Sequence, residues 1–266
     1  MTGLIFESPD FIQSYNMGGA LKVVVVGAGG TGSALLSKLF QMNATLQKLG
    51  APALDVVVYD DDTVAMPNIG RQSFYEFDID RPKAEVLVER FNQFGATNWV
   101  AKVERFSATS ESLGYRDGGV ILFGCVDNAP ARKELHKAMH SFSRWGCVYV
   151  DAGNANRSGN VIVGMSAQVN GRKVVYPTVY DLYKSQLDEW KPVAGDSCSH
   201  EESIQRQDFG LNDMMAVLSS QVLWQLVRHG KCAYQMASVD FETGVMQSFQ
   251  PDPDYWSMFG YVVSTE

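Results

Sequence analysis

The chain has 266 residues, of which 45% are hydrophobic, and carries a formal net charge of −8. A chain of this size can bury the core of one large α/β domain or two smaller ones. The negative charge argues against nucleic acid as the main partner, because a phosphate backbone needs a basic surface. The N-terminal residues lack a signal-peptide pattern, and the longest apolar stretch, LKVVVVGAGG, is too short to span a bilayer. We therefore expect a cytoplasmic protein without a membrane partner.

Strands and helices are predicted to alternate over roughly the first 150 residues. Residues 1–20 are mixed in composition, and NMGGA at 16–20 is interpreted as a lead-in loop. Apolar, β-branched runs predict strands at 21–26, 53–62, 98–106, 119–128 and 147–154. Helices are predicted after the first, second and fourth strands, the second of them over 81–95 with Gly95 just past its end. This alternation indicates a Rossmann-like, mostly parallel sheet with helices on both faces.

The pattern changes after about residue 153. The dipeptide NG at 170–171 and the tripeptide ETG at 242–244 each separate two apolar runs, which predicts two hairpins. A long helix is predicted from Leu211, closed by His229 and Gly230. The second half is thus expected to continue the fold with antiparallel strands and one packed helix. Residues 176–208 lack a clear period, which is typical of a functional or disordered loop.

The stretch GAGGTG, residues 27–32, follows the first strand and opens a helix. Glycines there let the backbone approach a phosphate, and the helix N-terminus supplies amide donors. A tight structural turn is the alternative. The candidate nucleotide-binding glycines are Gly27, Gly29, Gly30 and Gly32.

The second strand ends in three aspartates, Asp60, Asp61 and Asp62. Asp60 comes first after the apolar run and is best placed to reach the ribose of a nucleotide. The interval from Gly32 to Asp60 is 28 residues, longer than the spacing of about 20 found in dinucleotide folds. Asp61 is expected to be a solvated loop acid, and the same alternative applies to Asp62.

Cationic and amide side chains follow the aspartates: Asn68, Arg71, Gln72 and Lys83. The glycine loop already serves a pyrophosphate, whereas a triphosphate brings more charge, which Arg71 and Lys83 would meet. Each would be a surface residue if considered alone, so the prediction depends on the ordered set.

Asp127 ends the fourth strand, where a carboxylate points into the ligand crevice of a parallel sheet. Beside a triphosphate it would hold Mg²⁺, which prefers hard oxygen ligands. The alternative is that Asp127 or Asn128 caps the helix that follows.

Several motifs follow one another along the chain: G-x-G-G-x-G, D-x-D-x-V, N-x-x-R-Q, K, and a strand ending in D-N. Over roughly residues 20–240 this order resembles the E1-like adenylyltransferases, the ThiF/MoeB/HesA family. The late stretch GDSCSHEESIQRQD looks most like bacterial ThiF proteins of the PRTRC system. The resemblance implies an ATP-dependent enzyme that activates the C-terminal carboxylate of a small ubiquitin-like or sulfur-carrier protein, forming an acyl-adenylate and pyrophosphate. It also implies one domain over 1–266, with a nucleotide-binding half at 20–153 and a partner-binding half at 154–250.

The resemblance implies a role for each matching residue. Asp60, with Asp62 beside it, would bind ribose, and Asn68, Arg71, Gln72 and Lys83 would lie around the phosphates of ATP. Asp127 would hold the magnesium ion. Cys198 lies where relatives carry a thioester- or persulfide-related cysteine, and a loop cysteine without a role is the alternative. The implied catalytic residues are Arg71, Lys83, Asp127 and Cys198.

Three departures from the family pattern keep alternatives open. The segment FIQSYNMGGA contains no arginine to reach a partner subunit, which leaves a homodimer open. No Cys-x-x-Cys pair occurs, so no structural zinc is expected, and DIDRPK replaces the usual glycine before the lysine. An NAD- or FAD-binding oxidoreductase and a non-catalytic docking module remain the alternative functions. His136, His140 and His229 receive no metal-binding role.

Overall fold

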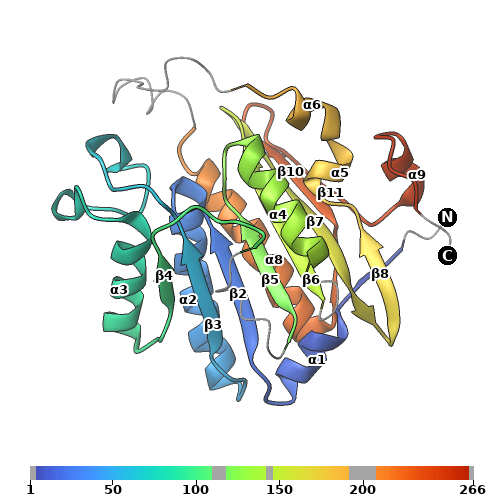
Figure 1. The fold of residues 1–266 in the computed structure, drawn as a ribbon, viewed down its shortest axis with the longest axis horizontal. Helices are drawn as coiled ribbons and strands as arrows, with labels where there is room; N and C mark the ends of the chain where they lie inside the picture. Colours follow the sequence, from blue (N-terminus) through green and yellow to red (C-terminus); the bar gives the residue numbers. More distant parts are fainter. Residues whose placement is uncertain (1–3, 110–117, 142–145, 192–207, 264–266) are drawn as a thin grey trace.

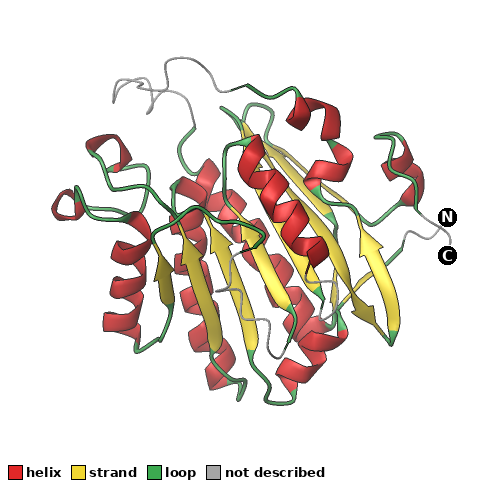
Figure 2. Cartoon of the chain, in the orientation of Figure 1, coloured by secondary structure: helices red, strands yellow, loops and turns green. Residues whose placement is uncertain are grey.

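The structure is a computed structural model that describes residues 4–109, 118–141, 146–191 and 208–263. Within these residues a nine-stranded sheet forms the middle layer, and helices cover both of its faces (Figures 1 and 2). The strand order is β11-β10-β7-β6-β5-β2-β3-β4, and β8 pairs with β7 beside this path. This arrangement confirms the predicted fold class.

The first half supplies the parallel strands. They are β2 (Leu21–Val26), β3 (Leu54–Tyr59), β4 (Val100–Lys102), β5 (Val120–Gly124) and β6 (Cys147–Asn154). Helices α2 (Gly30–Lys48) and α3 (Lys83–Gly95) lie on one face, and α4 (Ala129–Ser141) lies on the other. Because both faces are covered, β2 needs no polar alternation, and its four consecutive valines are at most 4% exposed.

The second half supplies the antiparallel strands. They are β7 (Ser158–Val169), β8 (Arg172–Tyr176), β10 (Met236–Asp240) and β11 (Val245–Phe249). Both predicted hairpins are present, and Asn170 and Gly171 have positive φ angles of 51° and 73°, as a two-residue hairpin turn requires. Helix α8 (Leu211–His229) packs against α2 and against β6 and β7, which joins the two halves.

Short elements complete the described fold. The 3₁₀ turns η1 (Met66–Asn68) and η2 (Glu76–Asp78) lie between β3 and α3, and α5 (Val179–Leu182) and α6 (Lys184–Asp188) follow β8. Helix α9 (Pro253–Ser257) comes last. Among the described segments, no helix has both the length and the hydropathy that a bilayer span requires.

The predicted lead-in loop at residues 16–20 is confirmed, since helix α1 (Asp10–Asn16) ends at its first residue and β2 begins at Leu21, but two elements that the sequence did not indicate precede it. They are α1 itself and β1 (Phe6–Glu7), which pairs with β9 (Lys231–Cys232). Ile12 and Tyr15, one helical turn apart, are fully buried. A helix of seven residues carries too few apolar positions to show a period, so tertiary packing decides its formation.

The predicted end of α3 is also corrected. Gly95 is the last residue of the helix, and Ala96 adopts the left-handed cap conformation with φ of 50°. A Cβ on Gly95 would overlap the Phe40 ring of α2. The glycine therefore allows two helices to approach closely and does not serve as the cap.

Candidate functional site

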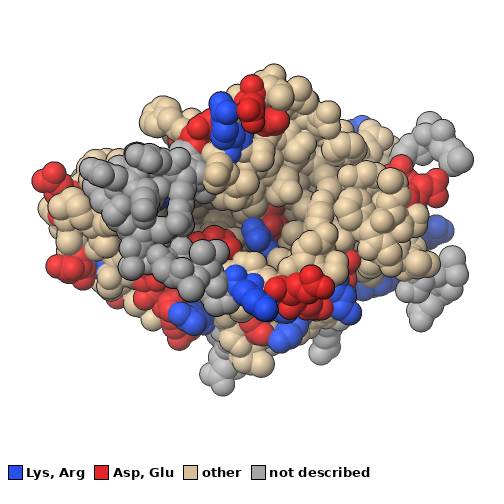
Figure 3. Space-filling model, turned by 90° about the horizontal axis from the view of Figure 1, so that it is seen from above, with Lys and Arg blue, Asp and Glu red and all other residues tan. Residues whose placement is uncertain are grey.

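The sheet has a switch point between β2 and β5. From these two neighbouring strands the chain order runs outward in opposite directions, which leaves a crevice at their carboxyl ends. A cavity of about 720 Å³ lies there, within the range of about 300–1,000 Å³ typical of ligand sites. Figure 3 looks onto this face and shows a hollow that holds both acidic and basic side chains.

The glycine turn forms the floor of this cavity. Gly27 has a φ of +94°, and its N–H donates to the Tyr59 carbonyl at 2.8 Å. A Cβ on Gly27 would overlap the Cys125 carbonyl oxygen, so the turn passes directly against the end of β5. Gly29 and Gly30 line the cavity, and α2 begins at Gly30. The N-terminus of α2 therefore opens onto the site, where its amides favour an anion.

Asp60 is held against the glycine turn. Its Oδ2 accepts a hydrogen bond from the Ala28 N–H at 2.6 Å, and its Oδ1 accepts one from the Asp62 N–H at 2.9 Å. Burial raises the pKa of Asp60, while the Ala28 amide and the Lys83 charge oppose that shift. The carboxylate lines the cavity next to the glycine turn, the position expected of a ribose-binding acid.

Two cations face the cavity in different ways. The Lys83 side chain is 8% exposed, and its Nζ lies 2.8 Å from Asp62 Oδ2, whose side chain is 66% exposed. Arg71 and Gln72 also line the cavity. Within the described residues Arg71 has no ion-pair partner, so its guanidinium remains available to an anionic ligand.

Asp127 and Asn128 divide the two roles that the sequence leaves open. The Asn128 Oδ1 accepts a hydrogen bond from the Ala131 N–H at 3.0 Å, which is the cap of α4. Asp127 lines the cavity, is exposed, and accepts a 3.3 Å hydrogen bond from Asn128 Nδ2. Its carboxylate is therefore available to a ligand, and its hard oxygens suit Mg²⁺.

A cluster of Thr31, Asn154 and Asn212 also lines the cavity. Asn154 Nδ2 lies 2.6 Å from Asn212 Oδ1, and Thr31 Oγ1 donates to the same oxygen at 2.9 Å. The three residues come from α2, β6 and α8, so no local pattern in the sequence could have identified them. Trp190 and Glu134 are further lining residues that sequence analysis missed.

Some predicted residues lie elsewhere. Gly32 and Asn68 do not line the cavity. The Asn68 Oδ1 accepts from the Ala65 N–H at 2.9 Å and so holds its own turn, and a Cβ on Gly32 would overlap the Gly27 carbonyl oxygen. Asp61, expected to be a solvated acid, lies at the cavity's edge, where its side chain is 44% exposed and 2.8 Å from the Arg105 Nε. Cys198 lies outside the described residues.

The remaining cysteines differ in burial. Cys147 and Cys232 are buried, whereas Cys125 is half-buried and lines the cavity. Burial raises the pKa of all three thiols. None of them has the lowered pKa of a reactive thiolate.

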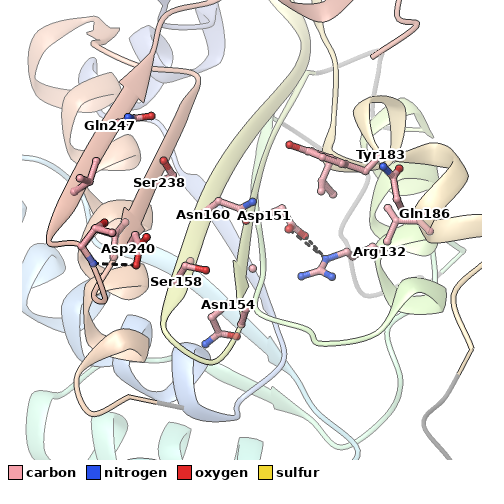
Figure 4. Close-up of a pocket in the computed structure, with 18 residues that line it drawn as sticks. Arg132, Asp151, Asn154, Ser158, Asn160, Tyr183, Gln186, Ser238, Asp240 and Gln247 are labelled. Atoms are coloured by element: carbon pink, nitrogen blue, oxygen red, sulfur yellow. Dashed lines mark hydrogen bonds and ion pairs between the residues drawn. The ribbon is translucent and has the colours of Figure 1, made fainter. Parts of the chain in front are cut away.

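A second cavity, of about 590 Å³, lies beside the first (Figure 4). Arg132 of α4 projects toward Asp151 of β6, and its Nε lies 3.1 Å from the Asp151 Oδ1. The Asp151 side chain is 1% exposed and also accepts the Tyr149 hydroxyl at 2.7 Å. The negative charge of Asp151 raises the pKa of Arg132 above its ordinary value. This buried pair anchors α4 to the sheet.

The rest of the second cavity is mostly neutral. Its wall carries apolar side chains from the region of α5 and α6, and amide or hydroxyl side chains from β6, β7, β10 and β11. Asn154 lines both cavities, so the two adjoin at the end of β6. Besides Arg132 and Asp151, Figure 4 labels one charged lining residue, Asp240, and the uncharged lining residues Asn154, Ser158, Asn160, Tyr183, Gln186, Ser238 and Gln247.

Comparison with known sequences finds a match to the ThiF family over residues 17–246. The chain is 30% identical over 121 residues to the sulfur carrier protein ThiS adenylyltransferase of Escherichia coli. This aligned stretch makes up 44% of this chain and 43% of that protein. The chain is also 28% identical over 147 residues to the NEDD8-activating enzyme E1 catalytic subunit of Saccharomyces cerevisiae, covering 53% and 46%. The chain thus matches less than half the length of each of these relatives.

Solved structures share the fold. Escherichia coli MccB, solved with ATP, superposes with a TM-score of 0.57 at 16% identity, covering 91% of this chain and 67% of that one. The microcin C7 biosynthetic enzyme MccB in complex with N-formylated MccA gives a TM-score of 0.60 at 15% identity, covering 91% and 68%.

Proposed function

Because the chain belongs to the ThiF family, we propose that it is an ATP-dependent adenylyltransferase acting on the C-terminal carboxylate of a small ubiquitin-like or sulfur-carrier protein. The names of the two curated relatives support this substrate class, and the ATP complex of MccB supports the nucleotide. We further expect a cytoplasmic enzyme.

One observation carries the proposal. Asp60, Arg71, Lys83 and Asp127 come from separate segments, yet all line one cavity above the glycine turn. Two cations beside a phosphate-binding turn exceed what the pyrophosphate of a dinucleotide requires, whereas a triphosphate uses them. The cavity therefore favours ATP over a nicotinamide or flavin cofactor.

The chemistry follows from these positions. A carboxylate oxygen of the carrier's last residue forms a bond to the α-phosphorus of ATP. The bond from that phosphorus to the bridging oxygen breaks, and pyrophosphate leaves with the electron pair. The ionised carboxylate needs no base, so the protein contributes positioning and charge neutralisation.

Each residue would contribute to this step differently. Asp60 would orient the ribose, the N-terminus of α2 would bind phosphate, and Arg71 and Lys83 would neutralise charge that moves onto the leaving pyrophosphate. Asp127 would hold Mg²⁺, which supplies further positive charge when bound. Asn68 is proposed only as a support for the turn that carries Arg71, and Cys198 as a later acceptor of the activated acyl group.

The second cavity is the proposed entry for the carrier's C-terminal tail. It lies largely in the antiparallel half, and its neutral amide and hydroxyl groups can pair with a peptide backbone. Since it adjoins the nucleotide cavity at Asn154, a tail lying in it would end beside the phosphates.

The test is exchange of labelled pyrophosphate into ATP in the presence of carrier proteins, beginning with E. coli ThiS. Exchange should require the carrier's C-terminal glycine, so a carrier truncated by that residue is the control. Protein that binds Mg·ATP but exchanges with no carrier would instead support the non-catalytic docking module.

A further inference from the structure

A cluster of metal-binding side chains lies apart from both cavities. His136 and His140 are on α4, and Asp181 is in the first turn of α5. Each offers one ligand atom, and these atoms lie within 4.8 Å of one another. None of the three lines either cavity, so the proposed adenylation does not use them.

The four-residue interval between the histidines places both on one face of α4. This is the interval by which two histidines on a helix bind one metal ion. The two rings lie 4.7 Å apart between centroids at an angle of 70°. Their third partner comes from a different element 41 residues later, which sequence spacing could not reveal.

Asp181 is already oriented toward the histidines. Its Oδ2 accepts the Thr178 N–H at 2.8 Å and the Thr178 hydroxyl at 2.9 Å, which fixes the carboxylate. That oxygen lies 3.6 Å from the His136 Nδ1, which is also 2.9 Å from the Thr178 Oγ1. Within the described residues no hydrogen bond reaches the other carboxylate oxygen, which remains available to a metal ion.

We propose that His136, His140 and Asp181 form a binding site for a divalent transition-metal ion of the zinc type. Two imidazoles and one carboxylate favour such an ion over Mg²⁺. Tetrahedral ligands at bonds of about 2.0–2.1 Å stand about 3.3 Å apart, so the side chains must close by roughly 1.5 Å at most. His140 is exposed and can rotate to do so.

The bound ion would join α5 to α4. Val179 of α5, Tyr183 just beyond it and Arg132 of α4 line the second cavity, and Figure 4 shows Tyr183 and Arg132 on the same side of it, across from Ser238 and Gln247. A metal ion at this position would hold α4 and α5 at a constant separation. The site is thus structural and independent of the proposed adenylation.

The test is calorimetric titration of Zn²⁺ into the full chain, purified without a histidine tag and freed of metal with a chelator. We expect one equivalent to bind, with affinity reduced roughly 10-fold or more in His140→Ala and in Asp181→Asn. His229→Ala is the matched control, because His229 ends α8 outside the cluster, and it should bind as the wild type does.

A second readout guards against misfolded variants. Zn²⁺ should raise the midpoint of thermal unfolding of the wild type and of His229→Ala, and should leave that of His140→Ala unchanged. Absence of binding in the wild type, wild-type affinity in both cluster variants, or an equal loss in His229→Ala would each overturn the proposal.

Discussion

The two cavities at the carboxyl ends of the strands differ in how their charged groups are used. In the proposed nucleotide cavity, Lys83 pairs with Asp62, but Arg71 has no ion-pair partner among the described residues, and the exposed Asp127 accepts a hydrogen bond from the neutral Asn128 amide. In the second cavity, Arg132 and Asp151 form a closed, buried pair. Open charges are available to a ligand, whereas a closed pair holds the protein together.

This difference separates function from stability. Removing an open charge should weaken activity with little effect on folding, because no buried partner is left alone. Removing one member of the closed pair should destabilise the fold, because its partner remains buried and charged. The predictions below test the contrast, from the largest expected effect to the smallest.

The largest effect is expected from Arg132→Met. It leaves the buried Asp151 carboxylate without its cation, which costs about 3–5 kcal/mol of unfolding free energy. Lys133→Ala is the matched control, because Lys133 forms a more exposed pair with Asp188 and should lose at most about 1 kcal/mol. Urea unfolding followed by circular dichroism measures both. Equal losses in the two variants would contradict a structural role for the Arg132–Asp151 pair.

Asp127→Ala should affect activity alone. We expect carrier-dependent pyrophosphate exchange to fall on the order of 100-fold, because the phosphates of ATP would lose the Mg²⁺ that Asp127 is proposed to hold. The free energy of unfolding should stay nearly unchanged. Asp55→Ala is the control, since Asp55 is an exposed acid on β3 that pairs with Lys22 and does not line the cavity, and its exchange should stay within about twofold of wild type. Wild-type exchange in Asp127→Ala would remove this residue from the site.

The glycine turn combines both kinds of effect. Gly27→Ala should destabilise the protein by about 1–3 kcal/mol and weaken ATP binding, because Gly27 has positive φ and its added Cβ would overlap the Cys125 carbonyl. Gly50→Ala carries a similar φ of +86° in open space, so it should show backbone strain of about 1 kcal/mol and normal ATP binding. Thermal unfolding and calorimetry distinguish the two.

The smallest effect concerns pH. Because burial raises the pKa of Asp60 above its ordinary value of 3.8, the unfolded chain releases this proton at lower pH than the folded protein does. As pH rises above 3.8, Asp60 therefore lowers stability until the folded carboxyl has ionised. Asp60→Asn should remove this part of the decline, which urea unfolding at several pH values would show. Parallel profiles for both proteins would contradict the raised pKa.

The sequence predicts best what depends on consecutive residues. The buried valines of β2, the glycine turn and the strand end at Asp60 all lie within local patterns that hydrophobic periodicity and backbone freedom explain. The two hairpin turns at Gly171 and Gly244 follow from the same local chemistry.

Features that depend on distant residues could not be predicted. Asn212 reaches the glycine turn from α8, and Asp151 meets Arg132 across a strand and a helix, without any interval that marks them. Asp127 and Asn128 both precede α4 and either could cap it from its position in the sequence, whereas in the folded protein Asn128 is the cap. Tertiary packing decides these pairings, and spacing along the chain does not encode them.

The most direct test of the account is calorimetric titration of Mg·ATP and of NADH into the wild type and into Arg71→Ala. The account predicts that Mg·ATP binds at one site in the wild type and that NADH binds much more weakly. Arg71→Ala should weaken the binding of Mg·ATP roughly 10-fold, because the phosphates lose a cation that has no other partner among the described residues. Tighter binding of NADH than of Mg·ATP, or equal ATP affinity in the two proteins, would contradict it.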